Sequence, residues 1–99
     1  MSAVATLTKQ ALHDKLESQI NAAAAKLDTL KARAESAKAH AEVKAIAELL
    51  PKKHAIQRKL DDLKKASENQ WEHAKTDLTS HVADFEKSVR EIEAKVKAH

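Results

Sequence analysis

The sequence has no glycine and no cysteine, and among its 99 residues it has one proline, one tryptophan and one phenylalanine. Glycine supplies the positive-φ positions of tight turns, so a chain without it is poorly suited to sheets joined by hairpins. The absence of cysteine excludes disulfides and fits a reducing compartment. These absences argue against an all-β or α/β fold and leave an all-α fold as the expectation.

Long apolar runs are also missing. No stretch approaches the roughly 18 apolar residues that a membrane-spanning helix needs. The opening "MSAVATLTKQALHDKLESQ" lacks the basic region followed by an apolar region that marks a signal peptide. We therefore expect a cytoplasmic protein.

Alanine, lysine, leucine and glutamate dominate, and 33% of the residues are charged, a composition typical of coiled coils. Apolar residues recur at alternating steps of three and four, the spacing of a seam between packed helices. We predict that this seam is the interface through which the helices, and copies of the chain, associate. Its main positions are Leu16, Ile20, Leu27, Leu30, Leu60, Leu63, Trp71, Leu78, Val82, Phe85, Val89 and Ile92.

The single proline, Pro51, lies almost at the midpoint. Proline costs about 3 kcal/mol inside a helix but almost nothing at the first position of a new one. We therefore predict one domain, residues 1–99, folded as an antiparallel helical hairpin with helices at about 4–50 and 52–97. Such a hairpin would be about 70 Å long, at about 1.5 Å per residue.

Two alternatives to a break at Pro51 remain open. The segment "LLPKKH" has no residue suited to capping a helix, whereas Ser67 and Gln70 form the S-x-x-Q pattern of a capping box. The chain could therefore turn near Ser67, or it could continue through Pro51 as one long kinked helix.

A two-helix hairpin leaves part of its apolar stripe uncovered. The economical solution is a homodimer that forms a four-helix bundle. The expected partners are therefore a second copy of the chain and, beyond it, other helical proteins.

The six histidines invite a metal-binding hypothesis. His73, Asp77 and His81 follow each other at four-residue steps on one predicted helix, but the outer two are separated by about 80° around its axis. No H-E-x-x-H motif is present, and the other histidines are scattered. We expect solvated surface histidines, with no metal and no cofactor.

Residues 52–65 hold the one local excess of positive charge. This stretch could contact phosphate groups or anionic lipid. It also contains Asp61 and Asp62 and no aromatic residue for base stacking, so a charged surface is the simpler interpretation. The candidate anion-binding residues are Lys52, Lys53, Arg58, Lys59, Lys64 and Lys65.

Residues 59–72 follow the pattern K-L-x-x-L-K-x-A-S-x-x-x-W-E. The stretch resembles the central signature of small bacterial coiled-coil proteins, a family without an assigned activity, and the likeness extends over about residues 12–97. The resemblance implies a coiled-coil fold and supplies no functional residues. Glu68 and Val82 depart from it, since the family tends to have glycine and a second tryptophan there, and Pro51 is unusual for the family.

No phosphate-binding loop and no nucleophile in a recognisable setting is present. We therefore predict a non-enzymatic structural or interaction protein that acts by coiled-coil self-association and by binding helical partners. The alternatives are an amphipathic binder of lipid or granule surfaces and a nucleic-acid binder that uses residues 52–65.

Overall fold

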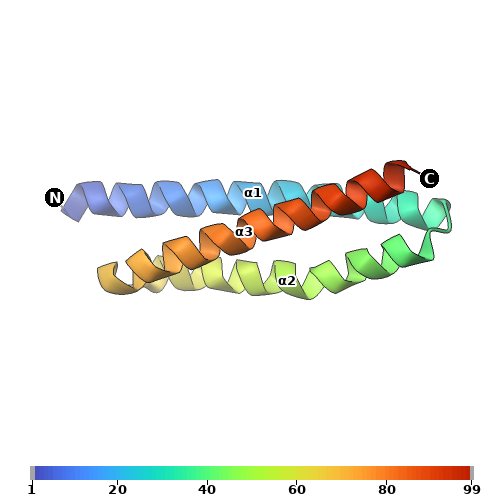
Figure 1. The fold of residues 1–99 in the computed structure, drawn as a ribbon. Helices are drawn as coiled ribbons and strands as arrows, with labels where there is room; N and C mark the ends of the chain where they lie inside the picture. Colours follow the sequence, from blue (N-terminus) through green and yellow to red (C-terminus); the bar gives the residue numbers. More distant parts are fainter. Residues whose placement is uncertain (1, 99) are drawn as a thin grey trace.

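The computed structural model describes residues 2–98, and it describes side chains at positions 9–67 and 69–98. These residues form three α-helices: α1 (Ser2–Ser36), α2 (His40–Lys65) and α3 (Glu68–Lys97). Consecutive helices run in opposite directions, so α1 and α3 are parallel (Figure 1). The molecule measures 54 × 17 × 15 Å, and α1 alone spans nearly its whole length.

The all-α prediction is confirmed for the described residues, but the predicted hairpin is wrong. The chain turns at residues 37–39 and again at residues 66 and 67, so the expected helices 4–50 and 52–97 do not form. A fold in three parts explains why the bundle is 54 Å long and not about 70 Å.

Pro51 lies inside α2 and is exposed. The carbonyl of Ala47, which loses its helical partner, belongs to a residue that is also exposed, so water can satisfy it. Figure 1 shows α2 bowed, with its convex side away from the other helices, as expected for a proline on the outer face. Pro51 therefore bends a helix and does not end one.

The α2–α3 turn lies at the capping box that the sequence offers as an alternative to a break at Pro51. The Gln70 backbone N–H donates to Ser67 Oγ at 3.3 Å, and the Ser67 N–H donates to Gln70 Oε1 at 3.2 Å. Lys9 donates to the Ala66 carbonyl at 2.6 Å, which ties this turn to α1. The alternative of a turn near Ser67 is thus confirmed.

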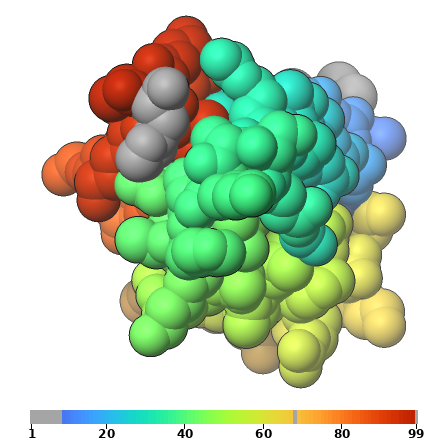
Figure 2. All heavy atoms as spheres, turned by 90° about the vertical axis from the view of Figure 1, so that its right-hand side faces the viewer, coloured from blue at the N-terminus to red at the C-terminus, as the bar shows by residue number. Residues whose placement is uncertain are grey.

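The α1–α2 turn has no such signal in the sequence. Lys38 adopts a φ of 56°, and the N–H groups of Lys38 and Ala39 donate to the carbonyls of Glu35 and Ala34. This is a Schellman motif, with lysine where glycine is usual. Ala34 and Ala39 are both buried, which is the apolar contact that accompanies the motif. Figure 2 looks onto this end of the bundle, where the turn and the first residues of α2 lie between α1 and the end of α3.

All twelve predicted seam residues are buried within the single chain. They form one continuous core with Ile46, Leu49, Ile56 and Val96. Three helices therefore cover the apolar stripe that two would leave open, and the physical reason for a four-helix dimer no longer holds. Substitutions such as Leu27→Asp or Val82→Asp would disrupt this core and so could not report on self-association alone.

Candidate functional site

A groove between α2 and α3 is the candidate site. It has a volume of about 350 Å³ and is lined by residues of both helices: Lys52, Ala55, Ile56, Lys59, His81, Asp84, Phe85 and Ser88. This volume is at the lower end of the range for ligand pockets, and the groove is open to solvent. It suits a surface contact better than the enclosure of a small molecule.

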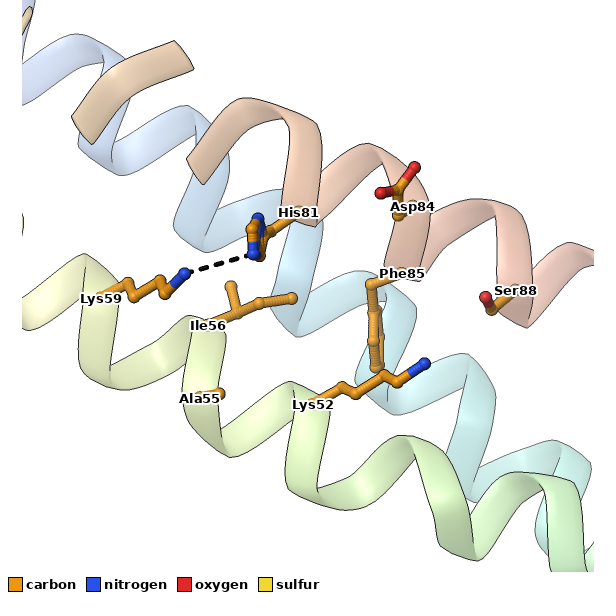
Figure 3. A pocket seen from close by; sticks show the side chains of 8 residues that line it. All are labelled: Lys52, Ala55, Ile56, Lys59, His81, Asp84, Phe85 and Ser88. Atoms are coloured by element: carbon orange, nitrogen blue, oxygen red, sulfur yellow. Dashed lines mark hydrogen bonds between the residues drawn. The ribbon is translucent and has the colours of Figure 1, made fainter. Parts of the chain in front are cut away.

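The floor of the groove is apolar and its two ends are cationic. Ile56 and Phe85 belong to the core and reach toward each other from the two helices (Figure 3). Lys52 and Lys59 extend from α2 on either side of Ile56, seven residues apart. Seven residues are two helical turns, or about 10 Å along the axis. The groove can therefore receive an apolar or short side chain between two negative groups.

The two lysines differ in their partners. Lys59 Nζ lies 3.2 Å from Asp77 Oδ2 and donates to His81 Nε2 at 3.2 Å. His81 Nδ1 lies 3.0 Å from the Asp77 carbonyl, so an Nδ1–H tautomer donates there and accepts from Lys59 at Nε2. Lys52 forms no ion pair with any described residue. It is thus the cation in the groove that is most available to a ligand.

The predicted basic cluster does not form one site. Lys52 and Lys59 line the α2–α3 groove, whereas Lys64 lines a different groove between α1 and α2. Arg58 and Lys65 are exposed and line neither groove, and Lys53 is half-buried. Because the stretch is helical, its charges spread around the whole of α2. This dispersal disfavours a phosphate-binding surface built from all six residues.

The histidine set also separates. His81 interacts with Asp77 and Lys59, while His73 is exposed and takes no part in that cluster. The described residues contain no group of three or more His, Cys, Asp or Glu side chains placed to hold a metal ion.

The expectation that the histidines are solvated is wrong for His13, which is buried. It is 5% exposed, and its ring lies against Asp14 at 3.3 Å and Glu17 at 3.6 Å. His40 and His54 are exposed, as expected, and His99 lies outside the described residues.

Trp71, one of the predicted seam residues, belongs to the core. It is 9% exposed, its Nε1 is buried without a hydrogen-bond partner among the described residues, and Lys75 Nζ lies 4.6 Å from the ring centroid.

Lys26 and Glu93 form an ion pair between the parallel helices α1 and α3. Lys26 Nζ lies 3.1 Å from Glu93 Oε2, and Lys97 Nζ lies 3.9 Å from the same oxygen. The hydrogen bond from Lys26, followed by the positive charges of Lys26, Lys97 and Arg33, holds the pKa of Glu93 below its ordinary value.

Comparison of the chain with protein-family models, with curated proteins and with solved structures finds no match. The resemblance of residues 59–72 to small bacterial coiled-coil proteins stays a prediction. Across the described residues, no helix combines the length and the apolar character needed to cross a membrane.

Sequence reasoning named Lys52, Lys59 and His81 but did not bring them together, and it missed Asp84 and Ser88 on the α3 side of the groove. Asp77 and Asp84 are seven residues apart, as the two lysines are. That shared spacing is a signal in the sequence, but it becomes informative only when the turn at Ser67 brings the two helices together.

Proposed function

We propose that this chain is a non-catalytic interaction protein that associates with other helices, including those of its own copies, through the surface of a three-helix bundle. The observation that carries the proposal is the α2–α3 groove, where an apolar floor lies between Lys52 and Lys59. The two lysines are two helical turns apart. An amphipathic helix can place acidic residues at that spacing with an apolar or small residue between them, so a helix is a suitable ligand for this groove.

The expected mode of self-association changes with the fold. A four-helix dimer built from the seam would require the bundle to open, because Ile20, Leu27 and Val82 are at most 1% exposed. Docking on the intact surface avoids that cost. Since such a contact uses exposed charges and a shallow groove, we expect it to be weak, reversible and sensitive to salt.

Sedimentation velocity over a wide concentration range tests this proposal. At low ionic strength the weight-average mass should rise with concentration, and at about 0.5 M salt it should fall back toward the mass of one chain. A mass equal to one chain at every concentration and at both salt levels would refute self-association.

A further inference from the structure

The exposed surface of α1 carries two rows of opposite charge. Asp14, Asp28 and Glu35 are separated by multiples of seven residues, and Lys26 and Arg33 are also seven residues apart. All five side chains are exposed. Because seven residues make nearly two full turns, each set lies along one flank of the helix, and the two flanks lie on either side of its outer face.

The α2–α3 groove carries two rows of the same spacing. Its α2 side has Lys52 and Lys59, and its α3 side has Asp84; Asp77, seven residues before Asp84, lines the adjoining groove that Lys59 also lines. The groove is therefore positive along one edge and negative along the other. Asp84 forms no ion pair with a described residue, and the same is true of Lys52.

We infer that the α2–α3 groove of one chain receives α1 of a second copy, an assignment that rests on the self-association proposed above. The acidic row of the incoming α1 faces the lysines of α2, and its basic row faces the aspartates of α3. Lys26 also pairs with Glu93 of its own chain, so Arg33 is the main basic contact of this row. For a right-handed helix this pairing fixes the direction: the incoming α1 runs antiparallel to α2 and parallel to α3.

One register satisfies both edges. With Asp28 level with Lys59, Glu35 lies level with Lys52, because both pairs are seven residues apart on antiparallel helices. Lys59 Nζ reaches both Asp77 Oδ2 and His81 Nε2 at 3.2 Å, so Lys59 lies within about one helical turn of Asp77 along α3. Along the parallel helix α3 the same register brings Lys26 and Arg33 to within about one turn of Asp77 and Asp84. The charges thus specify the pairing in the way that flanking charges specify a coiled coil.

The residues between the two rows suit the groove. Ala25, Thr29 and Ala32 lie on the outer face of α1 and are exposed. Their short side chains let the incoming helix approach the apolar floor formed by Ile56 and Phe85. The charge rows set the direction and register of the contact, and the small residues remove the steric obstacle.

The contact joins two different surfaces, so it is heterologous and leaves a free α1 and a free groove on every pair. Assembly therefore continues beyond the dimer or closes into a ring. This outcome differs from a symmetric four-helix dimer, which would stop at two chains.

Charge reversal on the full chain tests the inference, with sedimentation velocity at low salt as the readout. Lys52→Glu reverses the groove, and Glu35→Lys reverses the incoming helix. Each variant alone should associate roughly five- to tenfold more weakly than the native chain.

An equimolar mixture of the two variants should recover association. In the mixture the carboxylate introduced on α2 of one variant meets the ammonium group introduced on α1 of the other, while the native pair remains at the other junction. Lys44→Glu, at another exposed position on α2 away from the groove, is the matched control and should associate as the native chain does.

The outcomes separate this inference from the proposed function. Weakening by both single variants together with recovery in the mixture supports both. Self-association that the single variants leave unchanged, or that they weaken without recovery in the mixture, overturns this inference while the proposed function stands. A native chain that stays a single chain at all concentrations overturns both. Circular dichroism of each variant should show unchanged helix content, since all substituted side chains are exposed.

Discussion

In two short segments of this chain, the observed structure is the opposite of what the local sequence favours. Residues 48–54 contain the only proline, yet they remain helical. Residues 36–40 contain no glycine and no proline, yet the chain turns there with Lys38 at a positive φ of 56°. Local propensity alone would predict a turn at residues 48–54 and a continuous helix at residues 36–40.

The difference teaches that burial decides where this chain turns. Leu49 and Ile56 flank Pro51 and are both buried in the core. Burying such a side chain is worth about 1.5–3 kcal/mol, so the pair offsets a proline cost of about 3 kcal/mol. At residues 36–40 the left-handed lysine costs about 1–2 kcal/mol, and the turn it permits returns α2 onto α1 with Ala34 and Ala39 in contact.

Of the substitutions that test this comparison, Pro51→Ala should change the folding stability most. If tertiary packing holds a helix against the proline, its replacement by the best helix former should stabilise the fold by about 3 kcal/mol. Urea unfolding followed by circular dichroism measures the change. Pro51→Gly is the control. Its gain in stability should be about 1 kcal/mol smaller than that of Pro51→Ala, because glycine itself disfavours helix. A loss of stability in Pro51→Ala would mean that the core needs the bend.

Lys38→Gly should remove the strain at the other segment. Glycine adopts positive φ without a steric penalty, so we expect stabilisation of about 1 kcal/mol and a higher melting temperature. Lys31→Gly, at an exposed position inside α1, should instead lose about 1 kcal/mol. Equal losses in the two variants would contradict the left-handed turn at Lys38.

Ser67→Ala tests the turn whose signal is visible in the sequence. Loss of the hydroxyl that caps α3 should destabilise the fold by about 1 kcal/mol in thermal or urea unfolding. Ser80→Ala, at an exposed position within α3, should change stability by no more than a few tenths of that amount. A neutral Ser67→Ala would show that burial alone sets this turn too.

The smallest expected effect concerns pH. The lowered pKa of Glu93 means that its carboxylate stabilises the folded state above the ordinary glutamate pKa, and that this stability is lost as the pH falls through the folded-state value. Glu93→Gln should therefore lose less stability than the native chain between neutral and acid pH, as measured by urea unfolding at several pH values. The matched control, Glu91→Gln, is exposed and forms no ion pair with a described residue, so its loss should follow the native profile.

Much of the core could be read from periodicity. All twelve predicted seam residues are buried, because a helix with one apolar face must cover that face. The capping box at Ser67 was also visible, since it depends on residues only three apart. The turn at Lys38 was not visible, because a Schellman motif without glycine has no distinctive residue.

Only the α2 side of the candidate site could be predicted from the sequence as a set of residues on one face. Lys52 and Lys59 share a spacing of seven, which places them on one face of a helix wherever that helix lies. Phe85 and Asp84 join them because the chain turns at Ser67 and brings α3 alongside α2. A groove between two helices depends on which helices are neighbours, and that depends on both turns.

The sequence by itself therefore determined the all-α class and most residues of the core, and it offered one of the two turns as an alternative, because these follow from helical period and local capping. The number of helices and the fate of Pro51 were decided only by the tertiary structure. So were the position of the other turn and the groove that joins α2 to α3. The physical reason is that each of these depends on a balance between a local backbone cost of a few kcal/mol and the burial gained when distant segments pack.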